Sequence, residues 1–113
     1  MSVSYFVRYD VTAQDREAFL AYYRTHHVPI LARWPGLRRI VLHTPVEWGD
    51  AWPVQRGRAL LLAQLEFDSL EALHAAFGSP ERAEARADMA NFPPFEGQVT
   101  HQALESAEAW RKP

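Results

Sequence analysis

The most apolar stretch of this sequence, residues 58–67 (RALLLAQLEF), constrains the fold more than any other segment. Successive side chains of a β-strand point to opposite faces of the sheet, and here both faces are apolar. One face would carry Ala59, Leu61, Ala63, Leu65 and Phe67, and the other Leu60 and Leu62. A strand that is apolar on both sides belongs in the centre of a sheet, with cover on each face.

Three further segments have the β-branched and aromatic composition of strands. They span residues 2–9, 37–44 and 95–105. Residues 45–57, with two prolines, two glycines and two tryptophans, are expected to form a long loop before the central strand. Trp48 and Trp52 of this loop form either a lid over a pocket or a contact across a dimer interface, and we favour the interface.

A first helix is predicted from Thr12 to Leu31. Apolar residues recur in it at spacings of three and four, and Thr12 is the expected N-cap. Pro29 is expected to end or kink this helix, because proline has no amide hydrogen.

A second helical region is predicted after the central strand. Asp68 and Glu71 form a capping box at its start, and Gly78 closes its first part. Ser79-Pro80 restarts the helix, and Pro93-Pro94 ends it.

The order strand, helix, strand, strand, helix, strand predicts a ferredoxin-like α+β fold (βαββαβ) with a four-stranded antiparallel sheet. We expect residues 1–113 to form a single domain. Both helical regions cover the same face of such a sheet, which leaves the second face of the central strand without cover. A second copy of the chain is the simplest cover, so we expect a homodimer through the sheet face, with the two sheets forming an α+β barrel.

Composition excludes several classes of function. The net charge is −2 and no basic stripe is present, which argues against nucleic-acid binding. No apolar run approaches the roughly 18 residues of a membrane span, and no signal peptide is evident, so a cytoplasmic protein without a membrane partner is expected. The absence of cysteine excludes disulfides and thiolate chemistry. Motifs for a serine nucleophile, a P-loop, dinucleotide binding and zinc proteases are also missing.

Several segments together resemble the EthD family of dimeric α+β-barrel proteins. They are YYRTHHVPIL at 22–31, WPGLRR at 34–39, FDSLEAL at 67–73, SPE at 79–81 and VTHQ at 99–102. The wider superfamily includes cofactor-independent lactone isomerases, polyketide cyclases, small monooxygenases and dehydratases, together with proteins tied to ether breakdown. The resemblance implies a pocket between sheet and helices for a small hydrophobic, oxygen-bearing molecule, and no cofactor.

The pair His26-His27 is the first candidate for catalysis. Adjacent residues lie about 100° apart around a helix, so the two rings cannot bind one metal ion, and one faces inward. Periodicity does not decide which one, whereas the resemblance assigns the family's motif histidine to His27. An imidazole is suited to general acid or base catalysis near neutral pH. The alternative is a partly buried histidine that hydrogen-bonds a backbone carbonyl at the helix end.

Other candidate residues support this site. Tyr23, one turn before His27, would assist by orienting or polarising a substrate oxygen, and His43 is a second candidate catalytic group. The candidates for substrate contact are Tyr5, Phe19, Leu31, Phe67 and Trp52, although aromatic residues of this kind more often belong to the core. His101 is a weaker candidate than His43, and no metal site is expected.

Two functions follow from these residues. The first is a cofactor-independent isomerase, cyclase or dehydratase that uses acid-base chemistry on a small catabolic or polyketide-like compound. The alternative is a non-catalytic protein that binds a small molecule or assists a degradative system.

Overall fold

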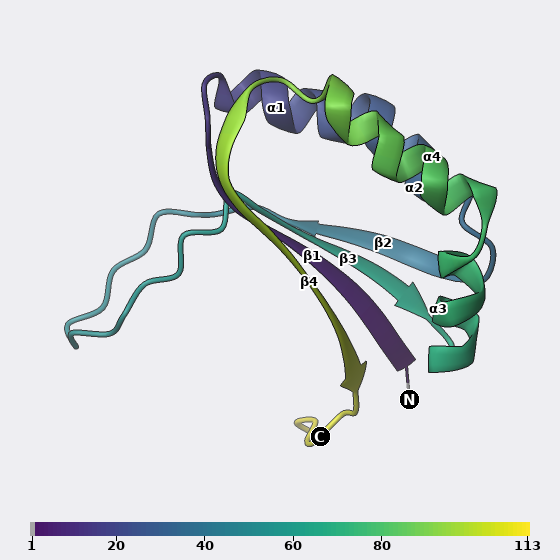
Figure 1. Cartoon of the computed structure of the whole chain (residues 1–113). Helices are drawn as coiled ribbons and strands as arrows, with labels where there is room; N and C mark the ends of the chain where they lie inside the picture. The colour runs from purple at the N-terminus through teal and green to yellow at the C-terminus, as the bar shows by residue number, and fades with distance from the viewer. Residues whose placement is uncertain (1) are drawn as a thin grey trace.

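Four strands form one antiparallel sheet in the order β2-β3-β1-β4 (Figure 1). The computed structural model describes residues 2–113. Its strands are β1 (Ser2–Ala13), β2 (Leu37–His43), β3 (Leu61–Phe67) and β4 (Phe95–Ser106). The predicted ferredoxin-like α+β fold is confirmed, with β1 and β3 in the centre of the sheet and β2 and β4 at its edges.

The helices lie over one face of this sheet, with α3 at one end (Figure 1). They are α1 (Arg16–Tyr22), a π-helix (Tyr23–His27), α2 (Val28–Leu31), α3 (Leu70–Phe77), α4 (Pro80–Asp88) and a 3₁₀ turn (Met89–Asn91). The helix-facing side chains of β3 are completely buried. The apolar core therefore lies between the helices and the central strands.

The strands β1 and β4 pair along their whole length and curve together towards α1 (Figure 1). Their register runs from Ser2 opposite Ser106 to Ala13 opposite Phe95, so β1 continues beyond the predicted end at residue 9. Gly97 lies within the curved part of β4, with φ of 134°. A Cβ atom at Gly97 would lie 2.3 Å from the backbone oxygen of Asp10, so the two strands approach closely here only because position 97 has no side chain.

The first helical region begins later than predicted and contains a π turn. Asp15 is the N-cap instead of Thr12, because Thr12 is still paired within the sheet, and the Asp15 carboxylate accepts a hydrogen bond from the Ala18 amide at 3.0 Å. The amide of Val28 donates to the Tyr23 carbonyl, five residues back. Pro29 has no amide to offer the Thr25 carbonyl, so the chain widens into a π turn before continuing as α2.

This π turn brings every fourth residue to the sheet side. In a regular α-helix, residues four apart drift by about 40° around the axis, whereas a π turn removes part of that drift. The four residues Phe19, Tyr23, His27 and Leu31 are all buried, whereas His26 is exposed. The structure therefore turns His27 inward.

In the second helical region, the predicted cap at Asp68 is wrong by one residue. The Ser69 hydroxyl accepts the hydrogen bond from the Ala72 amide at 3.1 Å, while the exposed Asp68 faces Arg38. Gly78 ends α3 as predicted. Ser79 caps α4, also as predicted, by accepting from the Arg82 amide at 3.2 Å.

The second face of the sheet is less apolar than the sequence suggested. Its apolar side chains are Phe6, Val41, Leu62 and Leu104, all at least partly exposed. Between them lie a hydrogen bond from Gln64 to Ser4 and an ion pair between Arg39 and Glu66. Polar pairs thus separate the apolar side chains of the face that the helices leave uncovered.

The segment between β2 and β3 extends away from the rest of the molecule (Figure 1). Trp52, in this segment, is 77% exposed, and the guanidinium of Arg56 stacks on Trp48 at 4.2 Å from its ring. Within residues 2–113, no helix is both long and apolar enough to cross a membrane.

Candidate active site

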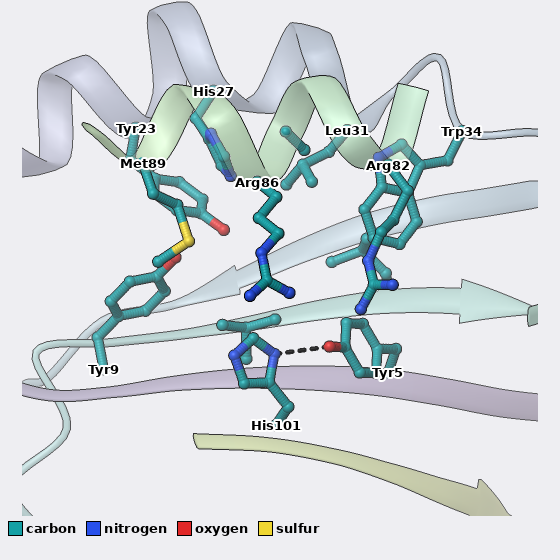
Figure 2. A pocket seen from close by; sticks show the side chains of 13 residues that line it. Tyr5, Tyr9, Tyr23, His27, Leu31, Trp34, Arg82, Arg86, Met89 and His101 are labelled. Atoms are coloured by element: carbon teal, nitrogen blue, oxygen red, sulfur yellow. Dashed lines mark hydrogen bonds between the residues drawn. The ribbon is translucent and has the colours of Figure 1, made fainter. Parts of the chain in front are cut away.

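A cavity of about 370 Å³ lies between the sheet and the helices (Figure 2). Small-molecule sites in proteins typically measure about 300–1,000 Å³. Figure 2 shows Tyr9 and Tyr23 at one end of the cavity, with His27 beside them, and Tyr5 and Arg82 at the other end. Arg86 and His101 lie between these two groups.

The side chain of His27 is directed into this cavity from the π-helix (Figure 2). Its Nδ1 atom lies 2.9 Å from Oδ2 of Asp88, at the end of α4. Burial lowers the pKa of His27, and the nearby Asp88 carboxylate offsets this only in part, so the ring is neutral near pH 7. A neutral ring that donates its Nδ1 hydrogen to a carboxylate keeps Nε2 free to accept a proton.

Asp88 is held in place by three hydrogen bonds. Besides His27, the Tyr22 hydroxyl donates to Oδ1 at 2.7 Å, and the Asn91 amide donates to the same atom at 3.2 Å. Burial raises the pKa of Asp88, but these hydrogen bonds outweigh it and keep the pKa below its usual value. Asp88 is therefore ionised at neutral pH and fixes both the tautomer and the orientation of His27.

Tyr23 and Tyr9 lie beside His27, with their hydroxyl groups at the same end of the cavity (Figure 2). The Tyr23 ring is 4.8 Å from the His27 ring and 5.6 Å from the Tyr9 ring. Burial raises the pKa of Tyr9 to about 12 and that of Tyr23 well above 10. Both are neutral phenols at neutral pH and can donate a hydrogen bond to a substrate oxygen.

At the other end of the cavity, the Tyr5 hydroxyl donates a hydrogen bond to Nδ1 of His101 at 2.6 Å (Figure 2). Burial lowers the pKa of His101, and the positive charges of Arg82 and Arg86 lower it further. His101 is therefore neutral near pH 7, with its remaining ring hydrogen on Nε2.

The structure brings four of the predicted site residues into the cavity wall. They are His27, Tyr23, Tyr5 and Leu31. Phe19 and Phe67 are buried in the core and do not line the cavity: the Phe19 ring contacts Phe92 and Phe95, with centroids 5.7 and 5.4 Å apart.

His43 and Trp52 lie away from the cavity. His43 is opposite Leu62 in the sheet, on the face that the helices do not cover, and its Nε2 donates to Gln64 at 3.0 Å. Trp52 is on the extended segment. The histidine that does reach the cavity is His101, which lies opposite Val7 on the helix-covered face.

Sequence reasoning missed Asp88, Arg82 and Arg86. A signal for the arginines was present, because Arg82, Ala85, Arg86 and Met89 have the spacing of one helix face, and all four line the cavity. Asp88 gave no comparable signal, since it is separated from His27 by 61 residues in the chain.

The fold and cavity define a ferredoxin-like α+β protein with a partly open site between sheet and helices. The sequence profile of the EthD domain matches residues 12–94. This chain belongs to the EthD family. It is 36% identical over 78 residues to an uncharacterized 11.0 kDa protein in the thcB-thcC intergenic region of Rhodococcus erythropolis, a match that covers 69% of this chain and 72% of the relative.

Solved structures share the fold. An EthD family protein from Bacillus halodurans has a TM-score of 0.76 at 23% identity, covering 95% of this chain and 100% of its own. SnoaB, a cofactor-independent oxygenase from Streptomyces nogalater, has a TM-score of 0.66 at 13% identity, covering 98% of both chains. A dimeric protein with a ferredoxin-like fold from Bacteroides fragilis has a TM-score of 0.62 at 14% identity, covering 93% of this chain and 96% of its own.

Proposed function

We propose that this protein is an enzyme that transfers protons on a small hydrophobic, oxygen-bearing molecule, by isomerisation, cyclisation or dehydration and without a cofactor. The observation that carries the proposal is the neutral His27 ring, oriented by Asp88 and directed into a cavity of about 370 Å³. A base of this kind is most effective when its pKa lies near the working pH.

An isomerisation illustrates the chemistry. Nε2 of His27 accepts the proton from a C–H bond next to a carbonyl group, and the electron pair of that bond moves into the carbonyl to give an enolate. The phenol of Tyr23 donates a hydrogen bond to the developing negative charge on oxygen. Where the deprotonated carbon also neighbours a carbon–carbon double bond, the enolate is a dienolate, and the protonated ring returns the proton to the far carbon of that system, so the double bond moves without an external reactant.

A cofactor-independent oxygenase is a second candidate, favoured by the fold shared with SnoaB. Such a reaction would also begin with proton removal by His27, after which the substrate anion would react with molecular oxygen. Oxygen consumption in step with turnover would favour this reaction, whereas turnover under anaerobic conditions would favour isomerisation, cyclisation or dehydration.

The test uses a panel of enol-lactones and polycyclic phenols in D₂O. NMR monitors whether the protein catalyses the exchange of their carbon-bound hydrogen for deuterium. The wild-type protein is expected to accelerate exchange for members of the panel. Binding without any exchange would instead fit the non-catalytic protein named as the alternative.

The pH dependence of this exchange is also predicted. The base form of His27 is neutral, so the rate should rise with pH through the pKa of His27 and then level off. Because burial lowers that pKa below 6.5, the plateau should already be reached at pH 7. A rate that continues to rise well above pH 7 would point to a base other than His27.

We also propose a homodimer through the face of the sheet that the helices leave uncovered. The apolar residues Phe6, Val41, Leu62 and Leu104 on that face support it, as does the dimeric state given for the ferredoxin-like neighbour. An interface built on this face would remove these side chains from water.

Leu62→Arg is expected to convert the dimer into a monomer, because it places an unpaired charge at the centre of the proposed interface. Light scattering coupled to size-exclusion chromatography measures the change in mass. Leu70→Arg is the matched control, since Leu70 is 48% exposed at the start of α3, away from that face. A Leu62→Arg protein that remains dimeric would place the interface elsewhere.

A further inference from the structure

Two guanidinium groups reach into the cavity from α4. Arg82 and Arg86 are one helical turn apart, and Figure 2 shows both side chains extending from the helix towards Tyr5 and His101. No Asp or Glu is among the residues that line the cavity. The cavity wall therefore carries two positive charges and no carboxylate to balance them.

The acidic residues of α4 do not neutralise this pair. Glu84 forms an ion pair with Arg33 at 2.8 Å, and Asp88 is bonded to His27, Tyr22 and Asn91. Within residues 2–113, neither Arg82 nor Arg86 takes part in an ion pair. Like charges four residues apart on one helix repel each other, and although the exposed Arg86 is partly screened by water, an anion bound between the two groups would offset the remaining repulsion.

The guanidinium of Arg82 lies between the Phe77 ring and the Tyr5 hydroxyl. Its guanidinium carbon lies 4.7 Å from the centre of the Phe77 ring, so the aromatic ring covers one face of the group. Stacking of this kind holds the guanidinium plane while its N–H groups remain directed outward along the edges.

Trp34 provides a second, independent observation at the same end of the cavity. It lines the cavity, and its ring lies 6.3 Å from that of Tyr5. The indole Nε1–H is buried and has no hydrogen-bond partner among the described residues. A buried donor without an acceptor is costly, and a ligand oxygen would supply the acceptor.

We propose that Arg82, Arg86 and Trp34 bind a carboxylate, so that the substrate is a hydrophobic organic acid. Guanidinium groups match the planar, two-oxygen geometry of a carboxylate. The acid group would lie on the sheet side, beside Tyr5 and His101, towards which both guanidinium groups extend, so it positions the molecule and is not the group that His27 deprotonates. The apolar body of the ligand then extends along Leu31 and Met89 towards His27. This inference names the substrate class of the proposed enzyme and rests on that function only where it calls the ligand a substrate.

The test compares acids with neutral analogues of the same shape. Benzoate and naphthoate are titrated against benzamide and naphthamide by isothermal calorimetry, at low and high salt. The wild-type protein is expected to bind the better-fitting acid at least about tenfold more tightly than its amide. High salt should weaken the binding of the acid only. Equal affinity for acid and amide, or no binding of either acid at millimolar concentration, would overturn the inference.

Variants locate the effect. The double variant Arg82→Gln/Arg86→Gln should lose the preference for the acid while still binding the amide. The Trp34→Phe variant should weaken the binding of the acid by a smaller factor. Arg33→Gln removes the same charge from a residue that does not line the cavity and should leave the preference unchanged. Loss of the preference in Arg33→Gln to the same degree would mean that general surface charge is responsible.

A His27→Gln protein separates this inference from the proposed function. If that variant keeps the acid preference and the wild type catalyses no exchange on any acid, the anion site stands and the enzymatic proposal fails. If exchange depends on His27 but acids and amides bind equally well, the enzymatic proposal stands and the anion site fails.

Discussion

His27→Gln is expected to slow the proposed deuterium exchange by about 10²–10⁴-fold, the range typical for loss of a general base. Glutamine is close in length to histidine and is also polar and uncharged, so the fold should be preserved. It has no nitrogen that accepts a proton near neutral pH. The exchange rate at pH 7, measured by NMR, gives the size of the effect, and a thermal melt confirms that the variant is folded.

The neighbouring residue offers a matched control. His26 is exposed and is turned away from the cavity, so His26→Gln makes the same chemical change one position earlier in the chain. This variant should exchange at close to the wild-type rate. Equal loss in both variants, or full activity in His27→Gln, would rule out the assigned base.

The Asp88→Asn variant tests whether Asp88 positions His27 for catalysis or only stabilises the fold. The Asp88 carboxylate raises the pKa of His27, so its removal should move the rising limb of the rate profile to lower pH. The plateau rate should also fall, because the amide of asparagine does not fix the tautomer with Nε2 free. A structural defect alone would lower the exchange rate without moving the rising limb of its pH profile.

Gly97→Ala is expected to destabilise the protein by about 2–4 kcal/mol, combining backbone strain with overpacking. Alanine rarely adopts a φ of 134°, and its Cβ would meet the Asp10 oxygen at 2.3 Å, a contact with backbone that no side-chain rotation relieves. For a domain of this size, the melting temperature should fall by roughly 8–20 °C. Calorimetry or circular dichroism measures the shift.

Gly49→Ala is the control for this change. A Cβ atom at Gly49 has no neighbour within 4 Å, so its substitution should alter stability by no more than about 0.5 kcal/mol. If Gly97→Ala melts at the wild-type temperature, the close approach of β1 and β4 at this point does not control stability.

The strand order could be predicted because each strand has its own local signal. The apolar character of residues 58–67 on both faces identified the central strand, and Ser79-Pro80 marked the start of α4. The limits of β1 were not predictable in this way. Residues 10–13 form a strand because β4 pairs with them, and such pairing depends on residues more than 80 positions away.

The site was predicted only in part, and the reasons are geometric. Periodicity could not choose between His26 and His27 because it assumed a regular α-helix, whereas the π turn changes which residues align. His43 and His101 each alternate with apolar partners in the sequence, so the pattern did not reveal which of the two lies on the helix-covered face of the sheet. Asp88 joins His27 only through packing of α4 against the first helical region.

The π turn also matters for how relatives of this protein can diverge. Such a turn holds one residue more than the same length of α-helix, so a relative that lacks one residue between Tyr22 and Val28 can keep both flanking helices in place. In that relative, a different side chain would occupy the place of the His27 imidazole. A deletion of a single codon would then change the chemistry of the proposed site while leaving the sheet and the rest of the cavity wall intact.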